Sequence, residues 1–156
     1  MARRDYDADG LTVHWDSARC VHTAICLNAL PEVFDVQRRP WVDVTGAAAA
    51  QIADAVLRCP TGALRFTWAD GTPEPAETPS VVFAVPNGPL VVRGEVALVD
   101  DSGATRRETR AAFCRCGRSG NQPFCDNSHR TGRFEPDPEA TESPAEVCPP
   151  QDERFA

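Results

Sequence analysis

The sequence predicts an α+β protein made of two small modules. Three features predict this: alternating apolar runs around helix-compatible segments in the first half, a Pro-rich stretch at 70–80, and several β-type runs after it. The chain has 156 residues, which is short for two domains of typical size. We therefore expect a module at 1–69, a linker at 70–80, a β-rich module at 81–134 and a disordered acidic tail at 135–156.

The first module is predicted to mix short strands and helices. Residues 11–15 alternate as a strand does, and residues 23–30 are compatible with a helix until Pro31 ends it. The remaining elements are a short strand at 41–44, a helix at 47–58, and a strand at 63–68 that pairs with the first.

The second helix of this module carries a cysteine at its end. Ile52, Val56 and Cys59 recur at i, i+4 and i+7, so they share one helix face, and we expect that face to be buried. The three tryptophans fall on the predicted strands, where large aromatic side chains anchor a small core; they are Trp15, Trp41 and Trp68.

The Pro-rich stretch separates this module from a β-rich one. Residues 70–80 hold three prolines, one glycine and no large apolar side chain, which is typical of a linker. Four β-type runs follow, at 81–85, 90–93, 95–99 and 108–113, and the last leads directly into Cys114. The last 22 residues show no apolar period, so disorder is expected there.

The charge distribution excludes some classes of protein. The net charge is −7, but residues 1–134 hold 16 acidic and 15 basic side chains, so nearly all the excess lies in the tail. Without a basic stripe, nucleic-acid binding is not expected. No apolar run approaches the length of a membrane span or a signal-peptide core, so we expect a cytoplasmic protein without a membrane partner.

The seven cysteines carry most of the functional information. Four potential ligands follow the last β-type run with the spacing C-x-C-x8-C-x3-H, and they are Cys114, Cys116, Cys125 and His129. In the reducing cytosol, clustered cysteines are more often metal ligands than disulfides. Three thiolates and an imidazole suit either tetrahedral zinc or a binuclear iron-sulfur cluster.

This segment resembles the CDGSH iron-sulfur domain family. It matches the family pattern at Cys114, Cys116, Ser119, Pro123, Cys125, Asp126, Ser128 and His129. The departure is Asn127 at the glycine position, and Asn is the residue best able to replace Gly where φ is positive. The resemblance implies a [2Fe-2S] cluster with Cys114 and Cys116 on the buried iron and Cys125 and His129 on the outer iron.

A second set of cysteines lies in the first module. Cys20 precedes the first predicted helix, Cys26 lies near its start, and Cys59-Pro60 follows the second. Small ferredoxins place C-x2-C-x2-C before a helix and finish with a distant Cys-Pro; here Thr23 stands where the middle cysteine would be. Three cysteines suit a [3Fe-4S] cluster, or a [4Fe-4S] cluster whose fourth iron takes His22, Thr23, water or an outside ligand. The alternative is that the three are buried core thiols.

Residues 15–64 also resemble the divergent single-cluster ferredoxin family. The resemblance is carried by Leu-Pro-Glu-Val-Phe-Asp at 30–35, Arg-Pro-Trp at 39–41 and Cys-Pro-Thr-Gly-Ala-Leu at 59–64. It implies a ferredoxin-like module with one cluster, and such modules often occur beside a CDGSH domain. Cys148, in the acidic tail, is expected to be a free thiol.

These observations predict a two-cluster iron-sulfur protein for one-electron transfer. Cluster storage or transfer by the His-ligated [2Fe-2S] centre is a variant of this function, and a structural or regulatory zinc module is the alternative. An enzyme is not expected, because no acid-base or nucleophilic constellation stands apart from the ligands. The expected partners are redox proteins, with a ferredoxin reductase-like donor; the acceptor and the oligomeric state stay open.

Overall fold

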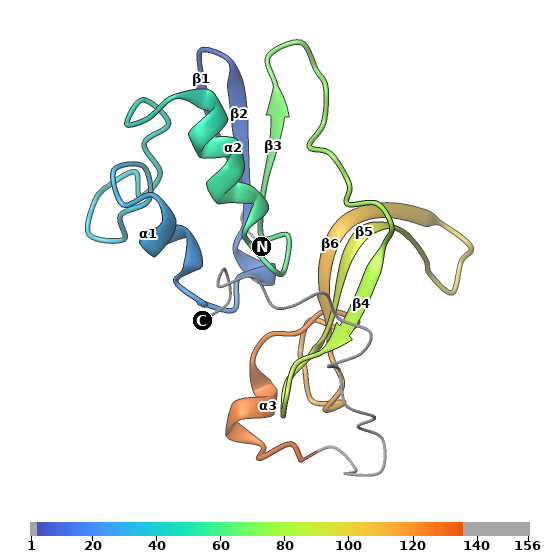
Figure 1. Ribbon diagram of the computed structural model, residues 1–156. Coiled ribbons are helices and arrows are strands. Elements are labelled where there is room, and N and C mark those ends of the chain that lie inside the picture. The colour runs from blue at the N-terminus through green and yellow to red at the C-terminus, as the bar shows by residue number, and fades with distance from the viewer. Residues whose placement is uncertain (1–2, 136–156) are drawn as a thin grey trace. The chain divides into compact units, whose positions relative to one another are not determined.

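The computed structural model describes residues 3–135 and divides the chain into two compact units, Met1–Pro75 and Ala76–Ala156. Each unit contains one three-stranded antiparallel sheet, and helices accompany both sheets (Figure 1). The α+β class predicted from the sequence is therefore confirmed. The predicted disordered tail, apart from Glu135, lies outside the described residues, and so does Cys148.

Unit 1 is organised around the sheet β1-β2-β3. These strands are β1 (Arg3–Ala8), β2 (Leu11–Asp16) and β3 (Leu64–Trp68). β2 pairs with β3 from Leu11 opposite Trp68 to Trp15 opposite Leu64, which confirms the predicted pairing. β1 was not predicted, because its side chains are mostly exposed and charged and therefore show no apolar alternation.

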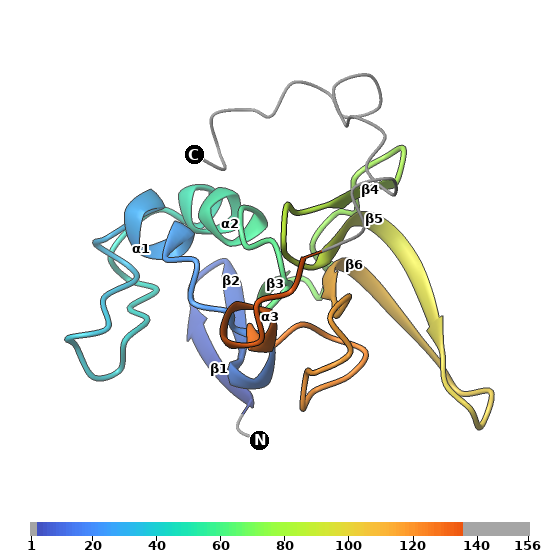
Figure 2. The same ribbon diagram turned by 90° about the horizontal axis from the view of Figure 1, so that it is seen from below.

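Two α-helices cover one side of this sheet (Figure 2). After the short 3-10 helix η1 (Ser17–Arg19) come α1 (Ile25–Ala29) and α2 (Ala49–Leu57). α2 buries Ile52 and Val56 in a core with Val13, Phe34 and Phe66. Among the described residues no helix is long and apolar enough to cross a membrane.

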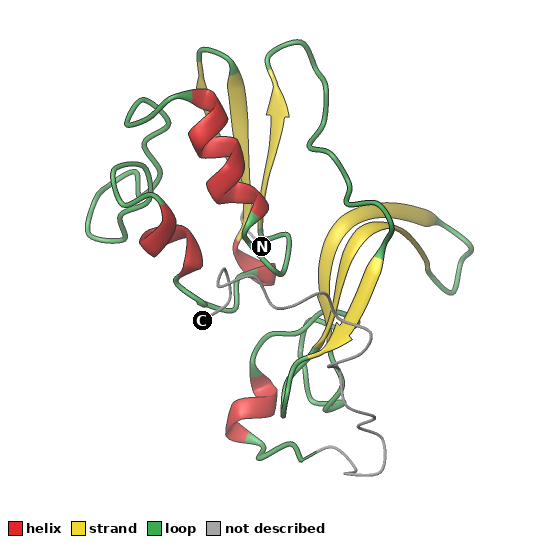
Figure 3. Ribbon diagram, in the orientation of Figure 1, coloured by secondary structure: helices red, strands yellow, loops and turns green. Residues whose placement is uncertain are grey.

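The segment between the two helices is mostly loop (Figure 3). The strand predicted at 41–44 is absent, and only a single bridge joins Val42 to Phe34. Pro40, just before the predicted strand, has no N–H to donate, and the apolar side chains of Val42 and Val44 are buried without a ladder. The prediction of a second strand was wrong for this reason.

The first part of the predicted linker packs onto unit 1. The Trp68 N–H donates to the Thr72 carbonyl oxygen at 2.8 Å, and the Glu74 N–H donates to the Phe66 carbonyl oxygen at 3.2 Å. The Glu74 carboxylate accepts the Phe66 N–H at 3.3 Å, and this residue is only 6% exposed. Residues 72–74 therefore extend the sheet beside β3.

Unit 2 contains the sheet β4-β5-β6. Its elements are β4 (Val81–Ala84), β5 (Leu90–Val99), β6 (Thr105–Phe113) and the short helix α3 (Ser128–Thr131). The predicted strands at 90–93 and 95–99 form one strand, interrupted by a register shift between Arg93 and Val96. Gly94 permits this shift, because its φ is +111° and a Cβ there would lie 2.5 Å from the Ser80 Cα.

Candidate metal centres

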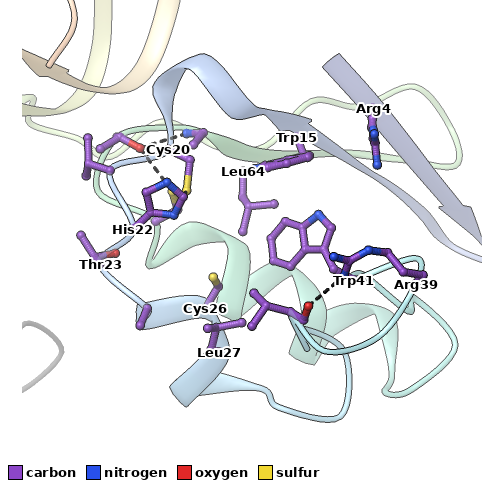
Figure 4. Close-up of a pocket in the computed structure, with 16 residues that line it drawn as sticks. Arg4, Trp15, Cys20, His22, Thr23, Cys26, Leu27, Arg39, Trp41 and Leu64 are labelled. Atoms are coloured by element: carbon purple, nitrogen blue, oxygen red, sulfur yellow. Dashed lines mark hydrogen bonds between the residues drawn. The ribbon is translucent and has the colours of Figure 1, made fainter. Parts of the chain in front are cut away.

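Three cysteines of unit 1 line one cavity of about 440 Å³ (Figure 4). Cys20 follows η1, Cys26 lies in the first turn of α1, and Cys59 follows α2. All three are half-buried thiols outside any disulfide. The segment at 20–26 and the end of α2, which are more than 30 residues apart, therefore bring to one cavity the three thiols that the sequence singled out.

The loop between Cys20 and Cys26 is tightly curled. His22 and Ala24 both adopt left-handed backbone conformations, with φ of 55° and 59°. The His22 imidazole Nδ1 lies 3.9 Å from the Cys20 Sγ, and Figure 4 shows the ring beside that thiol. Thr23 also lines the cavity. Both residues predicted as an additional ligand thus border the same space as the cysteines.

Burial makes two of the thiols of this cavity hard to ionise unless they bind a metal. Burial, helped by the charges of Cys59 and Cys20, raises the pKa of Cys26 to about 11. Burial also raises the pKa of Cys20, while the neighbouring His22 backbone and, more weakly, the Trp15 side chain act in the opposite direction. Three thiolates repel one another in such a site, and bound metal cations remove that cost.

The walls around the thiols are largely apolar. Leu27, Leu64, Trp15 and Trp41 line the cavity together with the cysteines. Thiolate ligands in a mostly apolar surrounding fit an iron-sulfur cluster, whose sulfur-rich surface needs little solvation. Sequence reasoning assigned Trp15 and Trp41 to the core alone; they do pack against it, but neither belongs to a ligand type that would have indicated the cavity.

The second constellation is built by a loop that folds back onto β6. The Cys114 N–H donates to the Pro123 carbonyl oxygen at 2.8 Å, and the Cys125 N–H donates to the Ala112 carbonyl oxygen at 2.8 Å. Phe113 and Phe124 stack with their ring centroids 5.8 Å apart. These contacts bring Cys125 to the end of the strand that delivers Cys114.

The four candidate ligands of unit 2 form two close pairs. The Sγ atoms of Cys114 and Cys116 lie 3.6 Å apart, and the Cys125 Sγ lies 3.4 Å from the His129 Nδ1. Within residues 3–135 no three His, Cys, Asp or Glu side chains are arranged around one point as a single-ion site would require. Pairing is compatible with a binuclear cluster, because each of its two irons takes two protein ligands.

Polar contacts hold this loop in shape. The Ser119 Oγ donates to the Phe124 carbonyl oxygen at 2.6 Å, and the Asp126 carboxylate accepts the N–H groups of Gly120 and Ser128 at 2.8 and 2.9 Å. The hydrogen bonds from Ser128, above all, lower the pKa of Asp126 to about 2. Ser119, Asp126 and Ser128 belong to the CDGSH pattern but are not among its ligands. In the structure each of them makes a hydrogen bond within the loop.

Asn127 has the backbone conformation expected of a glycine position. Its φ is 74°, in the left-handed region that Asn tolerates better than most residues. Its backbone N–H donates to the Cys125 Sγ at 3.4 Å. The substitution of Asn for Gly therefore leaves the turn and its N–H···S contact in place.

The thiols and the imidazole of this loop titrate in different directions. Burial opposes ionisation of Cys114, but hydrogen bonds from the Ser119 backbone and the Cys116 side chain outweigh it and lower the pKa. Burial raises the pKa of Cys125. Burial, with the charge of Arg130, lowers the pKa of His129 and favours the neutral imidazole, which is the form that binds metals.

Comparison with known proteins finds one matching family model in each unit. Residues 6–69 match the family model described as "Divergent 4Fe-4S mono-cluster", and residues 87–130 match "Iron-binding zinc finger CDGSH type". "Uncharacterized protein YjdI" of Escherichia coli strain K12 is 27% identical over 63 residues, which are 40% of this chain and 83% of that protein. The protein of the same name from E. coli O157:H7 matches to the same extent.

Proposed function

Because the chain joins a divergent 4Fe-4S mono-cluster domain to a CDGSH-type domain, we propose that this iron-sulfur protein carries two clusters and transfers single electrons. The observation that carries the proposal is the grouping of ligands: three thiols line one cavity in unit 1, and two ligand pairs lie in one loop of unit 2. Both sets fall inside the segments that match iron-binding families. None of the six cysteines of the described residues forms a disulfide, which fits a reducing compartment such as the cytosol.

In unit 2 we assign a [2Fe-2S] cluster to the two ligand pairs. Cys114 and Cys116 hold one iron, and Cys125 and His129 hold the other. The bound cluster supplies reversible one-electron redox chemistry. The protein's part is to keep the Cys114 thiolate hydrogen-bonded, to present His129 in its neutral form, and to hold the loop by its contacts with Ser119 and Asp126.

In unit 1 we assign a [4Fe-4S] cluster to Cys20, Cys26 and Cys59, with His22 as the fourth ligand. An imidazole is a common iron ligand, whereas the Thr23 hydroxyl is a much weaker one. The His22 ring already lies beside Cys20 at the cavity wall. Mutating His22 to Ala would open the fourth position, and conversion of the cluster to a [3Fe-4S] form is the expected result.

The two ligand sets imply different reduction potentials. Replacing a thiolate by a neutral imidazole removes negative charge and raises the potential of a cluster. That effect is largest for the smaller cluster of unit 2, where one imidazole serves two irons. We therefore propose that unit 1 accepts an electron from a reductase of the ferredoxin reductase class and that unit 2 passes it to an acceptor, with cluster donation by unit 2 as a variant.

Anaerobic purification with iron and sulfide analysis tests the cluster content. Two clusters of the proposed kinds require six irons and six sulfides per chain, and EPR spectra of the reduced protein should contain two distinct signals. A colourless protein with zinc in place of iron would instead establish a structural or regulatory zinc module.

Stopped-flow reduction by a ferredoxin reductase tests the order of electron transfer. The absorbance of the unit 1 cluster should bleach first, and Cys59→Ala should slow the reduction of the unit 2 cluster. An unchanged rate in that variant would show that the two clusters are reduced independently.

A further inference from the structure

Two tryptophans of unit 1 have buried indole N–H groups without an acceptor. Among the described residues, neither the Trp15 Nε1 nor the Trp41 Nε1 has a hydrogen-bond partner, although both atoms are shielded from solvent. Leaving a buried donor unpaired costs about 1–3 kcal/mol, so native proteins rarely tolerate it. Elsewhere in the described part of the chain, Tyr6 and Arg38 also have a buried polar atom without a partner. Of these residues only the two tryptophans line the cavity with the cysteines, which indicates that an acceptor is supplied by something bound there.

Both indoles line the cavity that holds the three cysteines (Figure 4). Their rings meet edge to face, with centroids 5.1 Å apart and an interplanar angle of 68°. Trp41 also packs against Phe34, with ring centroids 5.9 Å apart, so its ring is fixed from the core side. Trp15 is therefore held between the sheet that carries it and a second, well-packed indole.

We propose that the Trp15 indole N–H donates a hydrogen bond to a sulfur atom of the unit 1 cluster and that Trp41 positions the Trp15 ring for this contact. The inference rests on the proposed function, because the acceptor is the cluster held by Cys20, Cys26 and Cys59. Cys20 is a candidate acceptor among the thiolates, because the Trp15 side chain is one of the groups that act on the pKa of that thiol, although the Trp15 Nε1 has no partner at hydrogen-bond distance within residues 3–135.

The contact has a defined consequence for the redox chemistry. A reduced cluster carries one more negative charge than an oxidised one, so a donor aimed at its sulfur stabilises the reduced state and raises the potential. A hydrogen bond to a charged group contributes about 1.5–3 kcal/mol, and only the difference between the two redox states counts. We expect about a tenfold change in the reduction equilibrium, which corresponds to about 59 mV for one electron.

The test compares the unit 1 midpoint potential in three versions of the full chain. Trp15→Phe removes the N–H and keeps an aromatic ring, and incorporation of 3-benzothienylalanine at position 15 keeps the two-ring shape without the N–H. Both variants should lower the midpoint potential of the unit 1 cluster by about 59 mV, which corresponds to a tenfold change in the reduction equilibrium. Trp68→Phe is the matched control, because Trp68 is also half-buried and packs edge to face on Phe66 at 5.1 Å, but does not line the cavity.

The sign of the shift separates the donor role from a packing role. If Trp15 only excluded water, its replacement by the smaller ring would admit solvent and raise the potential, since solvent also stabilises the reduced charge. An unchanged or raised potential in both position-15 variants would overturn the inference. Iron and sulfide counts are measured first on the wild-type protein, so absence of a unit 1 cluster there would refute the proposed function instead.

A second variant tests the role of Trp41. Trp41→Phe should keep the cluster and lower the potential by less than Trp15→Phe does, because the donor remains but its ring is held less firmly. In the double variant the potential should be no lower than in Trp15→Phe alone if the two residues act through one N–H. Additive shifts of equal size would show that Trp41 is a separate donor and would overturn its assignment as a positioning residue.

Discussion

The two units bring metal ligands together by opposite means. In unit 2 the four candidate ligands lie within sixteen residues, and turns and hydrogen bonds of one loop hold them. In unit 1 the three cysteines come from segments up to 39 positions apart, and they meet only because α2 packs against β3 and the loop at 20–24, with two left-handed residues, leads into α1. Spacing alone therefore defines the second site, whereas the first depends on a folded core.

The two units also differ in how their surroundings affect the pKa values of the thiols. In unit 1 burial raises the pKa of both Cys20 and Cys26, whereas in unit 2 burial raises the pKa of Cys125 but hydrogen bonds, mostly from the backbone, lower the pKa of Cys114. A buried thiol without compensation needs a bound cation to ionise, but a hydrogen-bonded thiolate is partly stabilised in advance. We expect unit 1 to depend more strongly on its metal than unit 2 does.

The largest expected effect is the loss of one cluster without the other. Cys59→Ala removes one of only three thiolates in unit 1, so iron should fall to the amount bound by unit 2, and unit 1 should unfold with its metal. Iron analysis and circular dichroism measure both changes. Cys148→Ala serves as the control and should keep both clusters; full iron in Cys59→Ala would mean that the unit 1 thiols are core residues.

Acid stability should distinguish the two sites next. The folded-state pKa of His129 is lowered by burial, so the stability that depends on the neutral imidazole is present above the usual pKa of 6.5 and is lost as pH falls through the lowered value. His129→Cys removes this protonation step. The unit 2 cluster of the variant should therefore last longer at mildly acidic pH in a visible-absorbance decay, while the unit 1 cluster decays as before. Equal decay rates in variant and wild type would argue against histidine ligation.

A smaller effect, on the stability of unit 1, is expected from a mutation of Glu74 near the end of that unit. Glu74→Ala removes the buried carboxylate that accepts the Phe66 N–H, so the free energy of unfolding of unit 1 should fall by about 1–3 kcal/mol. Denaturant titration followed by tryptophan fluorescence reports on unit 1, since all three tryptophans lie there. Glu77→Ala, which breaks the exposed ion pair with Arg93, is the control and should leave that transition unchanged. Equal transitions in both variants would show that residues 72–74 act only as a linker.

The smallest effect is expected at Asn127. Asn127→Ala places a side chain that strongly disfavours positive φ at 74° and should cost unit 2 about 1 kcal/mol, whereas Asn127→Gly should be close to neutral. Thermal unfolding of the unit 2 cluster, followed by its visible absorbance, measures both. Equal losses in the two variants would assign the cost to the Asn side chain instead of its backbone conformation.

Much of the site was predictable because metal ligands are restricted to few residue types. Spacing identifies the candidate ligands of unit 2, which are Cys114, Cys116, Cys125 and His129. The Cys-Pro that follows a helix identifies those of unit 1, which are Cys20, Cys26 and Cys59. The ligation of all seven stays a prediction. The positive φ at Asn127 was also anticipated, since few residues replace glycine at such a position. Trp15 and Trp41 were placed only in the core, because an aromatic residue carries no signal that separates a core wall from a cavity wall.

The sequence by itself indicated the candidate ligands and determined the α+β class, the pairing of β2 with β3, and α1 and α2, because ligand spacing and apolar periodicity are local properties. The structure alone decided three further features. β1 forms although it has no apolar pattern, β5 continues through Gly94, and Glu74 is buried beside β3. Each of these depends on backbone hydrogen bonds to a neighbouring strand, and such bonds are not encoded in the apolar periodicity of the segment itself.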